Sequence, residues 1–169
     1  MTVTLITGAN KGISGSRRPD SNAGVLGTTM DGATALHVFD INAVGIVRVT
    51  EAALPLLRRS SSPRVVTVSS NMGSFWAVTT PGPPEFAMPL ALYPASTSAA
   101  TTLTVQYAKS EPGIKFNAVE PRTTATDMTA PYDIGRPVHE RARTVVRLAT
   151  LGDDGPTGTL QDDDRVLRC

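Results

Sequence analysis

The residues of this sequence best suited to chemistry are hydroxyl side chains between a short strand and a long helix. Residues 65–68 form a β-branched, uncharged run typical of a strand buried on both faces, and Ser69 and Ser70 follow it. After a loop rich in proline and glycine, Tyr93 opens a segment of helical character that runs to residue 109. A phenol can donate or accept a proton, and such general acid–base assistance is typically worth about 10²–10⁴-fold in rate. The pattern favours hydrogen bonding to a substrate oxygen.

This arrangement resembles the catalytic half of a short-chain dehydrogenase/reductase. That family places a serine after one central strand and a Tyr-x-x-x-Lys motif at the start of the next helix. The resemblance favours Ser70 over Ser69 as the active-site hydroxyl and implies that Tyr93 is the catalytic phenol. Thr97 stands where the family has a lysine that holds the nicotinamide ribose and lowers the tyrosine pKa. Because threonine carries no charge, the phenol is expected to stay protonated at neutral pH, since a phenol left alone titrates near ~10.

A glycine-rich turn follows the first strand-like run, residues 2–7. Such a turn between a strand and a helix lets backbone N–H groups approach a pyrophosphate. The turn resembles the family's Thr-Gly-x-x-x-Gly-x-Gly fingerprint, with Ser14 in place of the third glycine. The resemblance implies NADP or NAD as the cofactor, bound through Gly8, Asn10, Lys11, Gly12 and Ile13. A plain strand-to-helix turn is the alternative.

The segment after this turn is shorter than the family pattern requires. Residues 14–20 contain no apolar periodicity, and Gly15 and Pro19 indicate a loop. An Asn-Ala-Gly motif follows directly, so the second to fourth strands of the family sheet are expected to be missing. Arg17 and Arg18 suit either a contact to a 2′-phosphate or a solvated basic loop. The resemblance assigns further cofactor contacts to Asn22, Ala23, Gly24 and Thr126.

A long helical pattern covers residues 28–59 and carries a broad apolar face. That face consists of Leu36, Phe39, Ile46, Val47 and Leu54. Residues 39–45 resemble the family segment whose asparagine joins the active site through its backbone and a bound water, which implies that role for Asn42. An amide at a helix kink beside Gly45 is the alternative.

Two further segments should border the site. The loop of residues 71–92 is apolar and stiffened by proline, so the stretch from Phe75 to Phe86 is expected to form a substrate lid or pocket wall. An interface, or a cover for exposed core, is the alternative. Residues 113–121 are typical of the next strand, and Arg122 replaces a family glycine after it, where it would crowd a cofactor or clamp an anion. The pattern ends with an amphipathic helix (137–150), a short strand (155–161) and an acidic tail (162–164) expected to fray.

Composition and charge exclude several classes of function. The chain has 169 residues and a formal net charge of +1, which fits one domain over residues 1–169 and gives no argument for nucleic acid or an anionic membrane. Its single cysteine, Cys169, permits no intrachain disulfide and no cysteine metal cluster. The chain shows no signal peptide and no apolar run that looks long enough to span a bilayer, so a cytoplasmic protein is expected.

Strand-like segments that alternate with long helices predict an α/β fold, a reduced Rossmann-like three-layer sandwich with a mostly parallel sheet of about four strands. The first strand is expected to lie beside residues 65–68. The resemblance implies a truncated NAD(P)-dependent oxidoreductase that acts on a small carbonyl or alcohol. It also implies a homodimer formed by the helices around residues 33–57 and 93–109. A cofactor-independent isomerase, dehydratase or cyclase and a non-catalytic dimerising module remain open.

Overall fold

The computed structural model describes residues 3–7, 24–125, 135 and 137–169. The first half of the chain forms β1 (Thr4–Thr7), α1 (Gly32–Phe39), the π-helical turn η1 (Asp40–Val44), α2 (Gly45–Leu57) and β2 (Arg64–Val68). Three short helices and a long one follow: η2 (Asn71–Gly73), α3 (Phe75–Thr79), η3 (Pro84–Ala87) and α4 (Leu92–Ser110). The last elements are β3 (Lys115–Val119), α5 (Val138–Ala149) and β4 (Thr159–Gln161).

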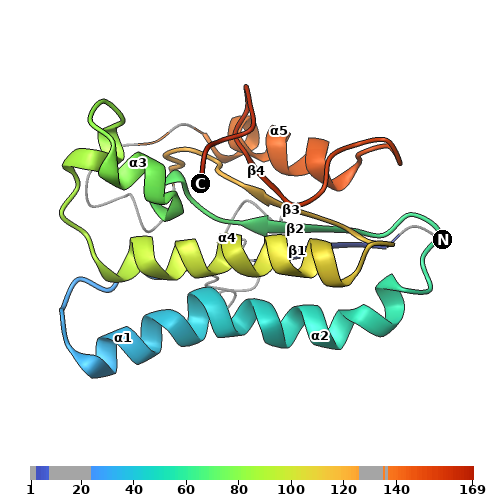
Figure 1. Ribbon diagram of the computed structural model, residues 1–169, viewed down its shortest axis with the longest axis horizontal. Helices are drawn as coiled ribbons and strands as arrows, with labels where there is room; N and C mark the ends of the chain where they lie inside the picture. Colours follow the sequence, from blue (N-terminus) through green and yellow to red (C-terminus); the bar gives the residue numbers. More distant parts are fainter. Residues whose placement is uncertain (1–2, 8–23, 126–134, 136) are drawn as a thin grey trace.

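The described strands form one parallel sheet in the order β1-β2-β3-β4. Val68 lies beside Val119, and Val119 beside Gln161, so the carboxyl ends of these strands share one edge. Figure 1 shows α2 and α4 on one side of the sheet and α5 on the other. The prediction of a reduced, parallel, three-layer α/β sandwich is confirmed, as is the pairing of the first strand beside residues 65–68.

The core divides into two clusters because successive side chains of a strand point to opposite faces of the sheet. Val65 packs with Leu57 and Phe116 in the cluster beneath α2 and α4. Val66 points the other way and packs with Leu148 in the cluster beneath α5. Burying one such side chain fully contributes about 1.5–3 kcal/mol. The β-branched run of β2 is therefore the central support of the sheet on both faces.

The π-helical turn η1 displaces the buried stripe of the long helix. The prediction that Leu36 lies on the buried face is wrong, because Leu36 is 76% exposed and Val38 is fully buried instead. A π turn holds one residue more than an α turn, so the apolar face on its N-terminal side does not keep the helical phase of α2. Asp31 starts this helix by accepting a hydrogen bond from the Thr34 N–H at 2.8 Å.

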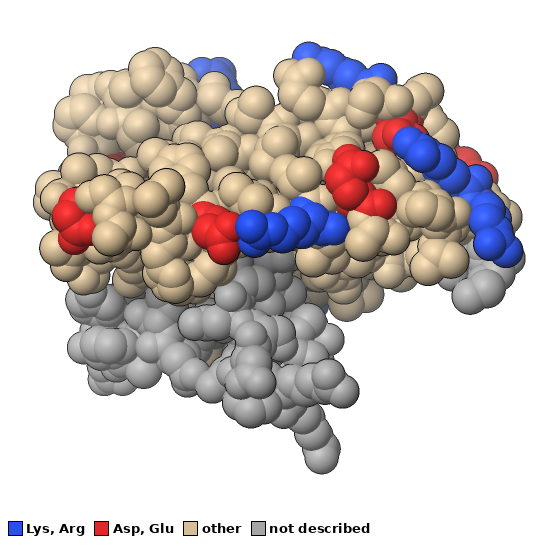
Figure 2. Space-filling view, turned by 90° about the horizontal axis from the view of Figure 1, so that it is seen from below, with Lys and Arg blue, Asp and Glu red and all other residues tan. Residues whose placement is uncertain are grey.

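The helical run Gly32–Leu57 keeps an apolar outer face. An 18-residue window in it has a mean hydropathy of 1.2, and 22% of that window is buried. By length and composition it could cross a bilayer, so the expectation that no such run exists is wrong. Its inner face, with Leu54 and Leu57, packs on the sheet like the core helix of a globular domain. The side of the molecule in Figure 2 carries few charges, and Leu36, Val49 and Leu56 are exposed. The homodimer that would cover these residues stays a prediction.

The acidic segment near the C-terminus is held in place, so the prediction of a frayed tail is wrong. Asp162 is 4% exposed, and its Oδ1 accepts hydrogen bonds from the N–H groups of Asp164 and Arg165, both at 2.9 Å. The Arg122 guanidinium donates to Asp162 at 3.1 Å and to Asp164 at 2.7 Å. Burial alone would raise the pKa of Asp162, but the backbone donors and Arg122 together lower it.

Arg64 is a buried cation that ties β2 to the chain after α5. Its side chain is 5% exposed and donates to the Leu151 carbonyl at 2.8 and 3.0 Å and to the Pro63 carbonyl at 3.0 Å. It also contacts the carboxylate of Asp153 at 3.0 Å, but that side chain is 90% exposed. Exposed ion pairs contribute little to stability, so the carbonyl contacts should dominate.

Replacing Arg64 by methionine should lower the free energy of unfolding by about 2–4 kcal/mol, because two inward-facing carbonyls lose a charged donor. Asp153→Asn is the matched control, since it removes only the exposed partner, and its urea midpoint should stay near that of the wild type. Urea denaturation followed by circular dichroism measures both variants. Equal losses in the two would mean that the ion pair, and not the carbonyl contacts, carries the effect.

Candidate active site

The candidate site lies where the carboxyl ends of β2 and β3 meet the N-terminal end of α4. The Ser69 N–H donates to the Val119 carbonyl at 2.8 Å, which continues the pairing of the two strands past Val68. Ser70 and Glu120 therefore leave the sheet at the same edge. A cavity of about 1330 Å³ opens there, as expected for open α/β sheets, in which ligands bind beyond the carboxyl ends of the strands. Its lining includes Gly24, Asn42, Ser70, Tyr93, Thr97 and Glu120.

The two serines after β2 have different surroundings. The Ser69 hydroxyl lies 2.8 Å from the Thr101 hydroxyl and 3.2 Å from the Thr97 carbonyl, so it docks α4 against the sheet. Ser70 is half-buried, and its Oγ accepts a hydrogen bond from the Met72 N–H at 3.2 Å at the start of η2. Both serines line the cavity, and the assignment of Ser70 as the active-site hydroxyl stays a prediction.

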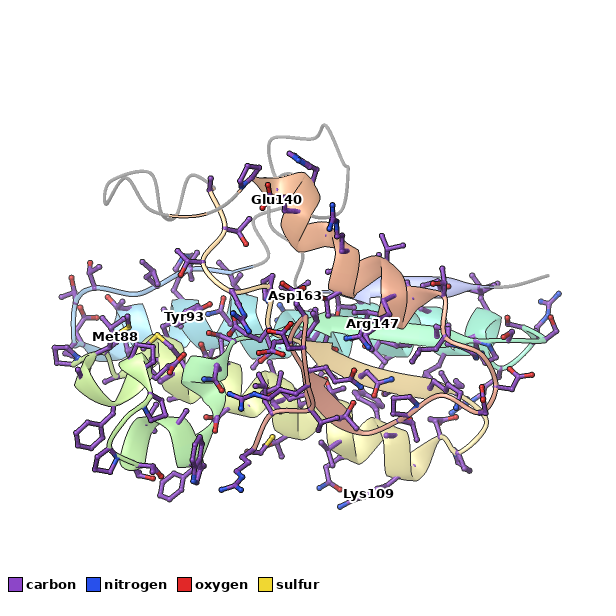
Figure 3. The ribbon with its side chains drawn as sticks, turned by 90° about the horizontal axis from the view of Figure 1, so that it is seen from above. Met88, Tyr93, Lys109, Glu140, Arg147 and Asp163 are labelled. Atoms are coloured by element: carbon purple, nitrogen blue, oxygen red, sulfur yellow. The ribbon has the colours of Figure 1, made fainter. Side chains whose placement is uncertain are left out.

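Ser70 and Tyr93 both line this cavity, and the Ser70 hydroxyl is near enough to the phenol to influence its pKa, so the structure brings the two predicted catalytic hydroxyls to one cavity. Burial raises the pKa of Tyr93 to about 12, the Glu120 charge adds to this, and the Ser70 hydroxyl opposes it. Such a phenol is protonated at neutral pH and suits a proton donor. Figure 3 shows Tyr93 near Met88 at one end of the molecule and Lys109 at the far end of α4. Lys109 lies about 24 Å along the helix from Tyr93, too far to replace the missing lysine.

Thr97 is turned into its own helix. Its hydroxyl donates to the carbonyls of Tyr93 at 3.0 Å and Pro94 at 3.1 Å, and the residue is 5% exposed. A hydroxyl used in this way brings no charge to the cavity. Gly73 approaches the same turn so closely that a Cβ at this position would lie 2.6 Å from the carbonyl carbon of Thr97. The lack of a side chain at Gly73 therefore lets η2, and Ser70 before it, lie against α4.

Asn42 lies in η1, and its side-chain amide forms hydrogen bonds with two other segments of the chain. Its Nδ2 donates to the Val25 carbonyl and to the Ser96 hydroxyl, each at 2.9 Å, and its Oδ1 accepts from the Val25 N–H at 2.9 Å. The side chain thus fastens the segment that contains Gly24 to α4. Asn42 lies at a helix irregularity beside Gly45 and also on the cavity wall. Its position therefore fits both interpretations, an amide at a helix kink and an asparagine of the active site.

Glu120 is a site residue that the sequence reasoning missed. Its carboxyl accepts a hydrogen bond from the Asn71 N–H and lines the cavity together with Ser70 and Tyr93. Burial raises the pKa of Glu120 and the nearby Glu85 charge adds to the rise, while the N–H groups of Asn71 and Arg122 and the Ser70 hydroxyl oppose it. The signal that points to Glu120 is its place directly after β3, because residues that follow neighbouring parallel strands meet at one edge.

The segment expected to cover the site supplies one wall of the cavity. Trp76 and Met88 line it, whereas Phe75 is 75% and Phe86 is 50% exposed. The segment thus borders the cavity as a wall, while the two phenylalanine rings at its ends face away from it. Successive residues of a short helix point in different directions, so Phe75 faces solvent while Trp76 faces inward.

Arg122 occupies the left-handed backbone region, with φ of 56°, which favours glycine. Its guanidinium is bound to the carboxylates of Asp162 and Asp164. The sequence suggested that Arg122 would either crowd a cofactor or clamp an anion. In the structure Arg122 clamps an anion, and this anion is a pair of carboxylates of the protein itself. Arg122 therefore joins the cavity edge to the C-terminal segment.

Most of the predicted cofactor contacts lie outside the described residues and stay predictions. These are Gly8, Asn10, Lys11, Gly12, Ile13, Asn22, Ala23 and Thr126. Gly24 is described and lines the cavity.

Comparison with known proteins identifies the family. The family model for short chain dehydrogenases matches residues 21–136. The chain belongs to the short-chain dehydrogenase/reductase family. Salutaridine reductase of Papaver bracteatum is 33% identical over 159 residues, which cover 72% of this chain and 50% of that protein. C-signal of Myxococcus xanthus is 35% identical over 134 residues, which cover 76% of each protein.

Solved structures of short-chain dehydrogenases/reductases share the fold. Salutaridine reductase from Papaver somniferum aligns with a TM-score of 0.64 at 30% identity, covering 76% of this chain and 54% of that chain. An NADPH-bound carbonyl reductase from chicken fatty liver aligns with a TM-score of 0.73 at 20% identity, covering 88% and 64%. The chain spans about half the length of the plant salutaridine reductases that it matches.

The family generally binds NAD(P), and the described residues fit the reactive end of such a cofactor in part. The cavity has room for a nicotinamide beside a substrate at Tyr93, with Gly24 on its lining. Thr97 offers no ammonium for the nicotinamide ribose, since its hydroxyl donates within α4. The glycine-rich turn that would hold the phosphates lies outside the described residues.

Proposed function

We propose that this short-chain dehydrogenase/reductase interconverts a small carbonyl compound and its alcohol, with NADP or NAD as the hydride carrier. The observation that carries the proposal is the placement of Ser70 and Tyr93 together on the cavity at the carboxyl ends of β2 and β3. Relatives named as reductases, such as salutaridine reductase and (-)-isopiperitenone reductase, support the same reaction class.

In the reducing direction, Tyr93 gives its phenolic proton to the substrate oxygen, and Ser70 stands beside it to hydrogen-bond the same oxygen. The nicotinamide, when bound, supplies the hydride to the carbonyl carbon. The phenolic O–H bond breaks as the O–H bond of the alcohol forms. With a pKa of about 12, Tyr93 is protonated at neutral pH and can give its proton to a carbonyl oxygen.

The apolar wall of the cavity favours a hydrophobic substrate. Trp76, Met88 and Leu90 line it together with several prolines. An aromatic ring supplies a large flat contact surface, and a methionine adapts to irregular shapes. We therefore expect a ketone or aldehyde that carries an apolar ring in preference to a short polar one.

Trp76 is the only tryptophan of the chain and lines the cavity, so its fluorescence can report binding directly. Titration with NADPH and NADH should give a saturable but weak change, because Thr97 and Ser14 replace two cofactor contacts of the family. Addition of apolar ketones should then consume the reduced nicotinamide. Thr97→Lys should tighten binding without restoring full family turnover, since it repairs one of these contacts. A flat fluorescence titration into the millimolar range, with no consumption of the nicotinamide, would refute the proposal.

A further inference from the structure

The segment that follows β4 folds back along its own strand and forms one wall of the cavity. The Leu167 N–H donates to the Leu160 carbonyl at 2.8 Å. Val166 lies beside Gln161 in an antiparallel bridge, so the chain reverses its direction between them. Backbone pairing thus fixes the course of this segment, which brings two arginines to the cavity. The wall consists of Arg165, Val166, Leu167 and Arg168.

Arg168 is held in place through both its backbone and its side chain. Its carbonyl accepts a hydrogen bond from the Ser74 hydroxyl at 2.5 Å, and Ser74 is fully buried at the start of α3. Its guanidinium lies over the Trp76 ring, 5.2 Å from the ring centroid. A guanidinium uses its flat face for such a contact and keeps the N–H groups on its rim for other partners. Arg168 is therefore a positioned cation beside the tryptophan of the cavity wall.

The acidic side chains of the cavity do not neutralise this cation. Among the residues that the structure describes, the ion pairs include neither Arg165 nor Arg168. Asp162 is bound to the third arginine of the cavity, Arg122, and Glu120 accepts a hydrogen bond from a backbone N–H. An arginine stays charged at any ordinary pH, so the positive charge of Arg168 is available to a ligand.

We propose that Arg168, assisted by Arg165, binds a carboxylate of the substrate; the carbonyl group of the same substrate rests on the proposed reduction. Charge-assisted hydrogen bonds between a guanidinium and a carboxylate are about twice as strong as neutral ones. Trp76 lies against Arg168 and lines the same cavity, so an apolar ring next to the carboxylate has a flat partner. The substrate class is thus an acid with an apolar ring, which presents its carbonyl to Tyr93 on the same cavity.

The test compares para-acetylbenzoate, an aromatic keto acid, with its uncharged methyl ester. Calorimetric titration at neutral pH, without any nicotinamide, should show that the wild type binds the acid at least about tenfold tighter than the ester. Arg168→Gln should remove this preference, because the amide carries no charge. Arg168→Lys should keep part of it, since an ammonium keeps the charge but loses the planar fork. Equal affinities for the acid and the ester in the wild type would overturn the proposal.

Arg59→Gln is the matched control for the loss of one positive charge. Arg59 is exposed just after α2 and is not among the residues that line the cavity, so this variant should keep the full preference for the acid. Arg165→Gln leaves the contact of Arg168 with Trp76 intact and should lower the preference less than Arg168→Gln does. The urea midpoint of each variant shows that it is folded. An unchanged preference in both cavity variants would overturn the proposal.

A phosphate of the cofactor is the other anion that could meet these arginines. Titration of Arg168→Gln with NADPH and NADH separates the two sources. A loss of affinity for both nucleotides, with an unchanged preference for the keto acid, would place a cofactor phosphate at Arg168 and overturn the proposal.

The outcome for the acid site is separate from that for the reductase function, because the calorimetric titrations contain no nicotinamide. The expected preference for the acid in a chain that reduces neither compound would support the carboxylate site and count against the reductase function. Reduction of both compounds with equal affinities would overturn the carboxylate site and leave the reductase function standing.

Discussion

Tyr93→Phe is expected to lower reductive turnover by at least about 10²-fold, and up to about 10⁴-fold, in a protein that keeps its fold. The substitution removes one oxygen, the proton donor of the proposed reaction, and conserves the ring at the start of α4. Loss of one polar contact of the phenol should cost only about 1 kcal/mol of stability. Single-turnover oxidation of the reduced nicotinamide, measured beside the urea midpoint, separates the two effects.

Tyr107→Phe is the matched control on the same helix. Its hydroxyl donates to Glu51 at 2.7 Å, and its ring stacks on Phe116 with centroids 5.4 Å apart. Tyr107 lies about 21 Å along α4 from Tyr93, so its hydroxyl should not affect turnover. Equal turnover in the two variants, or unfolding of Tyr93→Phe alone, would make Tyr93 a core aromatic residue and not a proton donor.

The pKa of Tyr93 also determines which group a pH profile reports. At about 12, the phenol stays protonated through neutral and moderately alkaline pH. A change of rate in that range therefore cannot come from its ionisation. Burial raises the pKa of the Glu120 carboxyl on the same cavity, so Glu120 titrates above the usual range of a glutamate.

Gly73→Ala should lower the free energy of unfolding by about 3 kcal/mol or more. A Cβ at this position would lie 2.6 Å from the carbonyl carbon of Thr97 and 2.7 Å from the Ser98 nitrogen, both backbone atoms that cannot rotate away. The added methyl group must push η2 from α4. The hydrogen bond from the Ser98 hydroxyl to the Gly73 carbonyl, 2.7 Å long, should weaken as well.

The same displacement should separate Ser70 from Tyr93, so Gly73→Ala should lose turnover even at temperatures where it stays folded. Gly32→Ala is the matched control, because a Cβ there meets nothing within 4 Å. At the first position of α1, alanine should leave stability unchanged or raise it by up to about 1 kcal/mol. Urea denaturation of both variants tests the pair, and a wild-type midpoint for Gly73→Ala would show that η2 and α4 have room to relax.

The strands and the place of the site follow from local patterns. A β-branched run such as residues 65–68 strongly predicts a buried strand. Hydroxyl residues that follow such a strand lie at the carboxyl edge of a parallel sheet. The order of the sheet was also predictable, because a segment as short as residues 14–20 leaves no strand to stand between β1 and β2. These inferences depend on one segment, or on two that adjoin.

The features that could not be predicted depend on contacts between distant segments, or on which side of a helix is buried after a π turn. The π turn shifts the buried stripe from Leu36 to Val38, and no apolar pattern announces it. Glu120 looks like any carboxylate in a turn until Ser70 is placed beside it by the pairing of β2 with β3. The acidic segment looks solvated until Arg122, about 40 residues earlier in the chain, is found against Asp162.

The strand order β1-β2-β3-β4 has a consequence for how the chain is made. Each strand lies only beside the strands just before and just after it among the described ones, so none has to be inserted between two that are already joined. The strands can therefore be added one after another at one edge of the sheet during synthesis, which proceeds from the N-terminus. Ser70, Tyr93 and Glu120 can therefore assemble once β3 has been synthesised, and β4 then arrives with Asp162, which fastens Arg122 over the finished edge.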